Sequence, residues 1–315
     1  MTKIVISSRS FSSGSLDLLA KLSTAGFTTK FVDSKHDLTE LAQELPGAVA
    51  WIAGTSKITS ETLNLAPNLK IIARYGVGFE SVDLTEAKAR GIIVTNTPGA
   101  NSLAVAELTI GLTLNALRAI STSASQVRSS DWSVIRGNQL EGSIVGIIGF
   151  GRIGRILAAK FHALGCELWI SDPFVDANEI KAAGYLAKSV SEIAANANVV
   201  SLNAPGDGAI VDKNWFTNSR MGQVIINSAR AELVDESAVA EALKSGKLFA
   251  YAADTLQGEK NSSSSPLMAA DIANKVTITA HLGAQTVAAI DLMGNMATEN
   301  VLAVLAGKAP INPVD

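Results

Sequence analysis

Short aliphatic runs alternate with helical stretches along almost the whole chain, and this alternation limits the possible folds more than any other feature. Strands separated by helices predict parallel βαβ units, because parallel neighbours need a crossover connection. The runs form two series, which predicts two doubly wound α/β domains, and 315 residues suit two domains of about 150 residues each. The strand runs of the first series are residues 3–8, 48–54, 69–78 and 92–97, and those of the second are residues 145–150, 167–173, 198–206, 223–229, 249–255 and 275–281.

The two series meet at Pro98-Gly99, which ends the last strand of the first series. Residues 100–120 follow with apolar positions at helical spacing, and this long helix suits a junction between domains. A final helical pattern covers residues 286–306 and is expected to return to the first domain. We therefore predict a first domain made of residues 1–98 and 286–315, with a second domain of residues 99–285 inserted into it.

Charge and cysteine content exclude several classes of protein. The formal net charge is −3 and no long run of Lys or Arg occurs, so no nucleic-acid or membrane partner is expected. No apolar run approaches the roughly 18 residues of a membrane span, and the N-terminus does not read as a signal peptide. Cys166 is the only cysteine, which excludes an intramolecular disulfide and a cysteine zinc cluster. We expect a soluble cytoplasmic protein without a metal site.

A glycine motif points to a dinucleotide. Gly149, Gly151 and Gly154 match G-x-G-x-x-G directly after a strand run and at the start of a helix, where backbone amides can approach a pyrophosphate. Asp172 ends the next strand, 23 positions after Gly149, where it can bond the adenosine ribose and repel the 2′-phosphate of NADP. The cofactor predicted from this context is NAD. The alternative is that the glycines only form a turn and that Asp172 only starts a turn before Pro173.

The three histidines of the chain differ in their surroundings. His36 lies in a polar stretch, and His162 lies on the helix after the glycine motif, where a structural role is expected. His281 stands at the end of an aliphatic strand run, and doubly wound sheets bind ligands at the carboxyl ends of their strands. Because histidine is the usual general base near neutral pH, His281 is the candidate base.

Other charged residues also follow strand runs. Arg230 comes directly after residues 223–229, where a guanidinium could bind a carboxylate bidentately. The alternative is a surface arginine paired with a nearby acid, Glu232 or Asp235. Asp254 and Glu259 flank the loop that follows residues 249–255, and either could bond the His281 imidazole. Spacing alone does not choose between these two acids.

Several segments together resemble the signatures of the D-isomer-specific 2-hydroxyacid dehydrogenases, in the order that the family has. The resemblance covers nearly the whole chain, and it is closest to the phosphoglycerate dehydrogenase branch through RYGVG and NTPGANS. The segments that carry it are RYGVGFESVD, GIIVTNTPGANSLAVAELTIGL, GFGRIG with SDP, INSARAELVDESAVAEAL, the interval from Asp254 to Glu259, and AHLGAQT.

This resemblance implies a flavodoxin-like substrate domain and an inserted Rossmann NAD-binding domain, through which two copies form a homodimer. The implied reaction interconverts an (R)-2-hydroxy acid and a 2-keto acid with NAD, as 3-phosphoglycerate dehydrogenase does. In this family pattern Arg230 clamps the substrate carboxylate and polarises the carbonyl, Glu259 orients the histidine, and His281 is the acid/base.

Further contacts are implied by the same resemblance. Asp254 matches the aspartate that bonds the nicotinamide carboxamide, while the backbone of Arg152 and Ile153 meets the pyrophosphate. Additional expected cofactor contacts are Val77, Ala204, Pro205, Ser228, His281 and Gly283, and the expected substrate contacts are Arg74, Gly76, Val77, Gly78 and Arg230.

The chain departs from the family pattern at a few positions. Asn203-Ala204-Pro205 stands where the family usually has His-x-Pro. Ala231 replaces a glycine, Thr255 replaces a valine, and Ala280 replaces a proline. Lys260 follows Glu259 in place of a proline. These departures leave alternatives open: glyoxylate/hydroxypyruvate reductase or another D-2-hydroxyacid dehydrogenase, and, in a different class, an NAD-sensing corepressor-like protein. Relatives that are formate dehydrogenases have glutamine at the position of Glu259, so the carboxylate favours hydroxy acid chemistry.

Arg74 is the residue that bears on the substrate class. It lies at the end of a strand run, two residues before Gly76. We expect its guanidinium to add positive charge to the substrate cleft and to favour a dianionic acid such as 3-phosphohydroxypyruvate. The alternative is an ion pair with Glu80 or Glu86 beside the loop.

Overall fold

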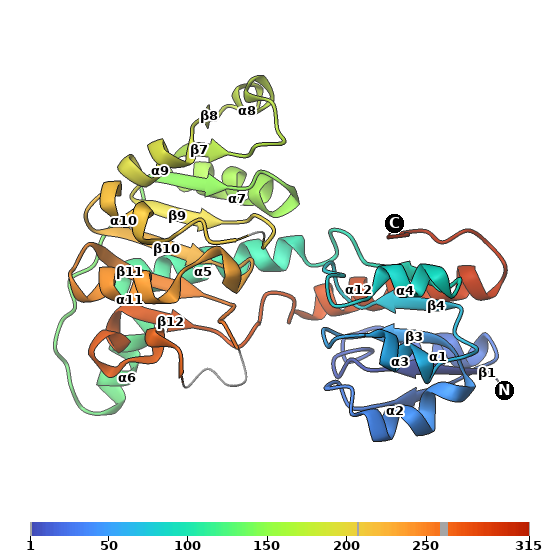
Figure 1. Cartoon of the computed structure of the whole chain (residues 1–315). Coiled ribbons are helices and arrows are strands. Elements are labelled where there is room, and N and C mark those ends of the chain that lie inside the picture. Colours follow the sequence, from blue (N-terminus) through green and yellow to red (C-terminus); the bar gives the residue numbers. More distant parts are fainter. Residues whose placement is uncertain (1, 207, 259–263, 315) are drawn as a thin grey trace. The chain divides into compact units, whose positions relative to one another are not determined.

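The computed structural model describes residues 2–206, 208–258 and 264–314, and it divides the chain into two compact units (Figure 1). Unit 1 consists of Met1–Asn101 and Ala284–Asp315, and unit 2 consists of Ser102–Gly283. The boundaries predicted from sequence are 98/99 and 285/286, and the two units meet at 101/102 and 283/284.

Unit 1 is built on a five-stranded parallel sheet with the strand order β2-β1-β3-β4-β5, which is the flavodoxin-like order. The two faces of this sheet are covered by separate cores, so the central strands are buried on both sides. β2 was not among the predicted runs because, as an edge strand, it carries alternating exposed polar residues. The strands are β1 (Thr2–Ile6), β2 (Phe27–Phe31), β3 (Ala48–Ala53), β4 (Ile71–Arg74) and β5 (Ile93–Thr95).

Two helices of unit 1 come from opposite ends of the chain and share one core. The helical pattern predicted from residue 286 forms α12 (Val287–Leu305), and Met293 and Val301 on this helix pack in the same cluster as Leu18 and Leu22 of α1 (Leu18–Thr24). Aspartate side chains cap α1 and two other helices of the unit. The opposite face of the sheet is covered by α2 (Leu38–Glu44), η1 (Leu45–Gly47), α3 (Ser60–Asn64) and α4 (Leu84–Ala89).

Unit 2 is built on a seven-stranded parallel sheet with the order β12-β11-β10-β9-β6-β7-β8. Counted from β6, this is the Rossmann order 3-2-1-4-5-6 with one further strand beside the last. The order reverses between β6 and β9, and such a switch point is where doubly wound sheets bind their ligands. The strands are β6 (Ile144–Ile148), β7 (Glu167–Ser171), β8 (Leu186–Ala187), β9 (Val199–Leu202), β10 (Gln223–Asn227), β11 (Leu248–Ala253) and β12 (Val276–Ile278).

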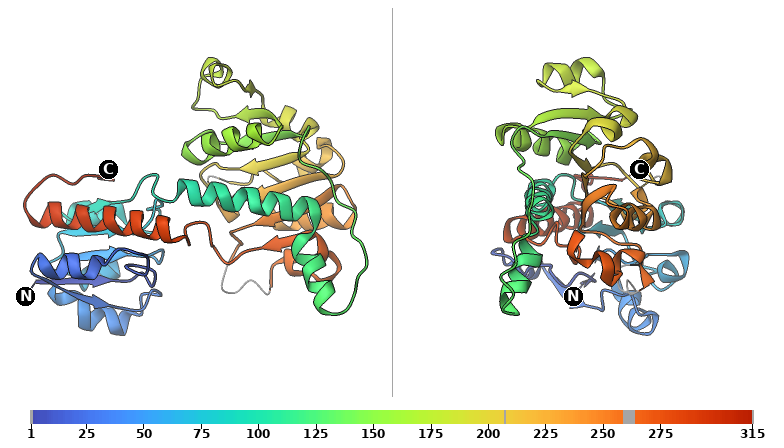
Figure 2. Two further views of the ribbon diagram at one scale, coloured as in Figure 1. Left: turned by 180° about the vertical axis from the view of Figure 1, so that it is seen from behind. Right: turned by 90° about the vertical axis from the view of Figure 1, so that its left-hand side faces the viewer.

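Helices cover both faces of this sheet. α5 (Ser102–Arg118) and α7 (Arg152–Ala163) pack in one core cluster, and α9 (Val190–Asn196), α10 (Lys213–Asn218) and α11 (Glu236–Lys244) pack in the other. Figure 2 shows α5 lying across one face of the sheet. The remaining elements of the unit are α6 (Ile120–Arg128), α8 (Ala177–Ala182), η2 (Ala231–Leu233), η4 (Pro266–Met268) and η5 (Ala270–Lys275).

The helix predicted over residues 100–120 ends at Arg118. Ala119 adopts a left-handed backbone conformation with φ of 50°, so the chain turns there and α6 starts in a new direction. In the part of the chain that the structure describes, no single helix is long and apolar enough to span a membrane; only α5 and α6 taken together pass that test, and they are bent by 63° at their junction.

Candidate functional site

The glycine motif forms the turn between β6 and α7. Gly149 has a φ of 97°, and a Cβ at this position would come within 2.5 Å of the Asn203 carbonyl oxygen and 2.9 Å of the Ala204 nitrogen. A Cβ at Gly154 would collide with the Gly149 carbonyl oxygen. The first and third glycines are therefore required by the packing of the protein itself, and they bring β6 and α7 close to the residues that follow β9.

Gly151 has a different role from the other two glycines. No heavy atom lies within 4 Å of a Cβ built on it, so the protein leaves open space over this backbone. Gly151 is the N-cap of α7, it makes no side-chain cap hydrogen bond, and the first turn of α7 carries no acidic residue. The positive end of α7, which begins at Arg152, is therefore open to an anionic ligand such as a pyrophosphate.

Asp172 lies directly after β7 and beside the glycine turn. Its Oδ2 accepts a hydrogen bond of 2.6 Å from the Phe150 nitrogen, and its Oδ1 accepts one of 2.8 Å from the Phe174 nitrogen. The structure thus joins the acid to the glycine motif, as the sequence pattern indicates, and Asp172 also starts a turn at Pro173. A carboxylate that contacts the turn in this way is placed to bond the ribose of a dinucleotide.

Arg230 lies in the loop after β10 and is half-buried. Its Nη1 donates a hydrogen bond of 3.0 Å to the Ala229 carbonyl oxygen. A Cβ at Gly206 would lie 3.2 Å from Cβ and Cγ of Arg230, so the stem of this side chain packs against the backbone that follows β9. The neighbouring acid Asp235 caps α11 by accepting hydrogen bonds from backbone nitrogens. Arg230 is therefore positioned at the carboxyl edge of the unit 2 sheet.

Asp254 follows β11 and is almost completely buried. Its Oδ1 accepts hydrogen bonds from Thr279 Oγ1 at 2.6 Å and from the Leu282 nitrogen at 2.7 Å, and its Oδ2 accepts one of 2.7 Å from the Gly283 nitrogen. These partners lie on both sides of His281. Asp254 therefore fixes the backbone of the turn that carries the histidine.

His281 is exposed and has a φ of 55°, a left-handed conformation that glycine adopts readily and that asparagine, aspartate and histidine adopt more often than other residues. Its backbone nitrogen donates a hydrogen bond of 3.0 Å to the Thr279 carbonyl oxygen. Such a conformation persists only where the surrounding contacts determine it, and the carboxylate of Asp254 supplies those contacts. The turn that carries His281 therefore has a defined backbone conformation.

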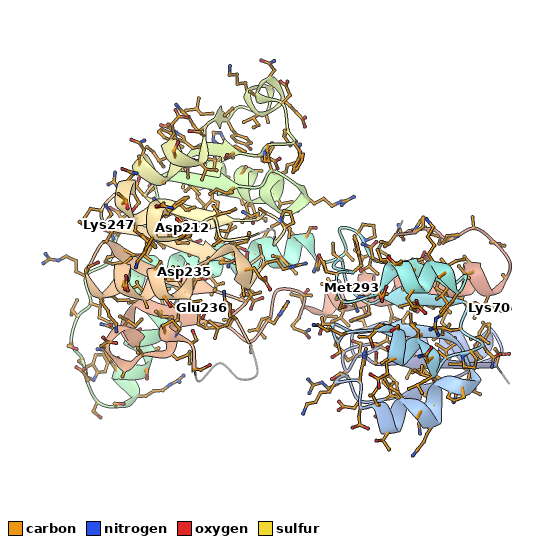
Figure 3. All side chains as sticks on the ribbon, in the orientation of Figure 1. Lys70, Asp212, Asp235, Glu236, Lys247 and Met293 are labelled. Atoms are coloured by element: carbon orange, nitrogen blue, oxygen red, sulfur yellow. The ribbon has the colours of Figure 1, made fainter. Side chains whose placement is uncertain are left out.

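Glu259, the other acid that the sequence places near the histidine, lies outside the described residues. Two described residues close to that segment are bound to Glu236, the first residue of α11. Glu236 is labelled in Figure 3. Glu236 Oε1 accepts a hydrogen bond of 2.8 Å from the Gln257 nitrogen, and Oε2 accepts one of 2.6 Å from Ser265 Oγ.

Ser228 and the residues after β9 complete the carboxyl edge of unit 2. Ser228 Oγ lies 2.7 Å from Thr109 Oγ1 of α5, so its hydroxyl ties the loop after β10 to that helix. Asn203 and Ala204 lie against Gly149, as described above, and Pro205 follows them at an exposed position. The predicted cofactor residues Ala204, Pro205 and Ser228 thus follow the carboxyl ends of β9 and β10.

In unit 1, Arg74 has a different environment from the one expected. It is 4% exposed, its Nη1 donates a hydrogen bond of 2.6 Å to the Ala53 carbonyl oxygen, and its Nε donates one of 3.2 Å to the Gly78 carbonyl oxygen. Burial lowers the pKa of Arg74 to about 10, although the negative charge of Glu80 acts in the opposite direction. The guanidinium therefore supports the loop of Gly76, Val77 and Gly78 in place of presenting an open charge.

The loop of residues 76–78 is held by other contacts as well. Asn96 Nδ2 donates a hydrogen bond of 2.7 Å to the Val77 carbonyl oxygen, and the Thr97 nitrogen donates one of 3.0 Å to the Gly76 carbonyl oxygen. Gly76 has a φ of 146°, which only glycine adopts readily. With three carbonyls engaged, the loop has a defined backbone conformation.

Sequence reasoning missed the packing role of His36. Its Nε2 lies 2.9 Å from Ser7 Oγ, its Nδ1 lies 2.9 Å from the Lys57 carbonyl oxygen, and its ring lies against Trp51. Burial lowers the pKa of His36. This buried group ties together loops at the carboxyl edge of the unit 1 sheet, and the polar sequence around residue 36 contains no signal of it.

A family model described as "D-isomer specific 2-hydroxyacid dehydrogenase, NAD binding domain" matches residues 110–283. A D-3-phosphoglycerate dehydrogenase of Mycobacterium leprae is 35% identical over 278 residues, which is 86% of this chain and 52% of the relative. A glyoxylate reductase of Thermofilum pendens is 30% identical over 273 residues, which is 81% of this chain and 78% of that protein.

Among solved structures, a protein of Thermus thermophilus is similar along the whole chain. It has a TM-score of 0.90 and 30% sequence identity, and the match covers 99% of this chain and 100% of that one. This chain spans about half the length of the curated phosphoglycerate dehydrogenases that it matches, at 52% of the Mycobacterium leprae protein.

Proposed function

Because the chain belongs to the D-isomer specific 2-hydroxyacid dehydrogenase family, we propose that it transfers a hydride between NAD and a small 2-hydroxy or 2-keto acid. The observation that carries this proposal is the arrangement at the carboxyl edge of unit 2. Arg230 follows β10, Asp254 follows β11 and His281 follows β12, and these three strands are neighbours in the sheet. The candidate carboxylate-binding cation and the candidate acid/base thus follow β10 and β12, with β11 and Asp254 between them.

The residues present fit the cofactor. Gly151 and the first turn of α7 leave open backbone for the pyrophosphate, and Asp172 offers a carboxylate to the adenosine ribose beside the same turn. NADH, when bound, supplies the hydride that reduces the keto carbon. We assign the backbone of Arg152 and Ile153 to the pyrophosphate. Further assigned contacts are Val77, Ala204, Pro205, Ser228, Asp254 and Gly283.

In the proposed mechanism Arg230 binds the substrate carboxylate through its guanidinium and draws electron density from the adjacent carbonyl. His281 donates a proton to the carbonyl oxygen during reduction and accepts it from the hydroxyl during oxidation. Asp254 holds the turn of His281 through the backbone, and we assign the orientation of the imidazole to Glu259 on the basis of the family pattern. The backbone amides of residues 76–78 are proposed to help bind the carboxylate.

We propose a phosphoglycerate dehydrogenase-like substrate, a 2-keto acid with a second anionic group. Support comes from the similarity to phosphoglycerate dehydrogenases and from the RYGVG segment. Arg74 acts in this proposal through the loop that it holds, since its guanidinium is engaged by two backbone carbonyls. The alternative within the same class is a glyoxylate or hydroxypyruvate reductase, which the relative from Thermofilum pendens represents.

The experiment for this function is a comparison of kcat/KM for 3-phosphohydroxypyruvate, hydroxypyruvate, glyoxylate and pyruvate, followed by the loss of NADH absorbance. The expected result is turnover of at least one 2-keto acid, with preference for 3-phosphohydroxypyruvate. If the protein prefers glyoxylate or hydroxypyruvate, it is a glyoxylate/hydroxypyruvate reductase and the phosphoglycerate dehydrogenase assignment is wrong. Absence of turnover with the whole panel would contradict the enzymatic proposal itself.

Asp172 is expected to select NADH over NADPH. Its carboxylate would lie beside the 2′-phosphate of NADPH, and a repulsion of about 1.4 kcal/mol corresponds to tenfold in kcat/KM. The Asp172→Asn variant keeps the shape of the side chain but not its charge, so the ratio of kcat/KM for NADH to that for NADPH should fall. The matched control is Asp176→Asn, which alters the exposed aspartate that caps α8 and should leave the ratio unchanged. A wild-type ratio near one contradicts the assignment.

We also propose that two copies associate through unit 2. The exposed stripe of α5 includes Gly111 and Leu114. Glycine in mid-helix costs about 1 kcal/mol relative to alanine. Nothing lies within 4 Å of a Cβ built on Gly111. A glycine at this place permits close approach of a second helix. Beyond α5, Trp132 and Val134 are 79% and 94% exposed, which is typical of surfaces that a partner covers.

The mass of the protein in solution tests this association. Leu114→Glu puts a charge on the α5 stripe and is expected to convert a dimer into a monomer, measured by light scattering or sedimentation. Leu164→Glu is the control, because Leu164 has a similar exposed fraction, 44% against 38% for Leu114, but lies at the end of α7. Equal masses for the wild type and both variants contradict the proposed interface.

A further inference from the structure

Asn227 has a side chain that bonds two backbone groups of the loop that carries Arg230. It is the last residue of β10 and is fully buried. Its Oδ1 accepts a hydrogen bond of 3.1 Å from the Ala229 nitrogen, and its Nδ2 donates one of 2.8 Å to the Arg230 carbonyl oxygen. The two partners are a donor and an acceptor, so they determine which way the amide faces.

The backbone of Asn227 takes part in a second set of contacts. Its carbonyl oxygen accepts a hydrogen bond of 3.0 Å from the Asp254 nitrogen, and the Asp254 carboxylate accepts hydrogen bonds from the Leu282 and Gly283 nitrogens next to His281. A continuous series of hydrogen bonds therefore connects the backbone of Arg230 to the backbone of His281. The series crosses β10, β11 and β12 at their carboxyl ends.

We propose that Asn227 is a positioning residue, which sets the backbone of Arg230 relative to His281 and so sets the distance between the carboxylate and carbonyl sites of the substrate. This inference rests on the proposed function. A side chain at this position must both accept from the Ala229 nitrogen and donate to the Arg230 carbonyl. Aspartate has the same shape but cannot donate when ionised, and serine is too short to span both partners.

The same strand contains a matched control at its other end. Gln223 is the first residue of β10, is also fully buried, and also uses a side-chain amide as a bridge. Its Oε1 accepts a hydrogen bond from Trp215 Nε1, and its Nε2 donates to the carbonyl oxygens of Ala194 and Ala197. Because these contacts lie at the amino end of the strand, Gln223→Glu tests the cost of a buried amide-to-carboxylate change away from the site.

The experiment compares wild type, Asn227→Asp and Gln223→Glu in thermal unfolding, in NADH binding by fluorescence titration, and in kcat and KM for the keto acid that the panel identifies. Both variants are expected to lose stability, because each leaves a buried carbonyl without its donor. Asn227→Asp is expected to lower kcat/KM for the keto acid by about 10- to 100-fold, since small misplacement of a binding group has effects of this size. Gln223→Glu should retain kcat/KM, and both should bind NADH as the wild type does.

A double-mutant cycle identifies the route of the effect. If Asn227 acts through Arg230, the effect of Asn227→Asp on kcat/KM should shrink in an Arg230→Lys background, whereas independent effects would multiply. If Asn227→Asp does not fold, Asn227→Ser replaces it in the same measurements, because serine is too short to bond both partners. Equal kinetic losses for Asn227 and Gln223 variants, or multiplication in the cycle, overturn the positioning role. A wild type that turns over no keto acid in the panel overturns the proposed function instead, so the two failures are distinguishable.

Discussion

Replacing His281 with asparagine is expected to lower kcat by about 10²- to 10⁴-fold, the range that a general acid/base typically contributes. Asparagine is the chosen substitute because it tolerates the left-handed φ of 55° that residue 281 adopts, so the turn held by Asp254 should keep its conformation. The imidazole lies at an exposed position on that turn, and its removal takes away the proton donor without altering the glycine turn of β6 and α7. The affinity for NADH should therefore remain close to that of the wild type.

His162→Asn is the control for this experiment. His162 is the other exposed histidine on unit 2, and its ring packs edge-on against Tyr185 near the C-terminal end of α7. Steady-state kinetics and fluorescence titration with NADH measure the two effects separately. If His281→Asn keeps more than about a tenth of the wild-type kcat, His281 is not the general acid/base of the reaction.

Arg230→Lys is expected to lower kcat/KM for the keto acid by about 10²- to 10³-fold, similar to the loss of one preorganised donor in an active site. The charge is conserved, but lysine has a single ammonium in place of the two parallel N–H groups that bind a carboxylate bidentately. Lysine keeps the Cβ and Cγ that lie beside Gly206, so the substitution tests the guanidinium and not the packing of the stem. The effect should appear with every 2-keto acid of the panel, because all of them share the carboxylate.

The control is Arg220→Lys, a change at an exposed arginine that lies outside the carboxyl edge of the sheet. It should leave kcat, KM and the unfolding temperature unchanged. KM for NADH should be unaffected in both variants, since Arg230 is assigned to the substrate and not to the cofactor. A loss confined to one substrate, or one equal to that of the control, would assign Arg230 to a structural role.

The strands of unit 2 could be predicted because a parallel sheet covered on both faces needs continuous apolar runs, and β9, β10 and β11 are such runs. The edge strands β2 and β8 were missed for the same reason: β2 carries exposed positions along its length, and β8 has only two residues. The end of α5 at Arg118 was also missed. Ala119 breaks the helix by its backbone conformation, and its identity as alanine favours a continued helix.

Of the candidate site, the sequence predicted the residue types that follow each strand. The glycine motif with Asp172, the arginine after β10 and the histidine after β12 could be identified because the carboxyl ends of parallel strands form one edge of the sheet. Asn227 was not singled out, although it stands three residues before Arg230 at the end of the same strand run. An asparagine at a strand end indicates a positioning role only when its side chain is known to be buried, and the sequence does not give that burial.

The sequence by itself determined the fold class, the alternation of the buried strands with helices, and the family, because these depend on local periodicity and on motifs read along the chain. The tertiary structure decided what each polar side chain does. Asp254 could have bonded the imidazole, but it holds the backbone around His281, and Arg74 could have offered its charge to a ligand, but it binds the carbonyls of Ala53 and Gly78. Hydrogen bonds form between the loops that the strand order brings together, and each buried polar group must find a partner there. The spacing of residues along the chain therefore predicts neither the partners of Asp254 nor those of Arg74.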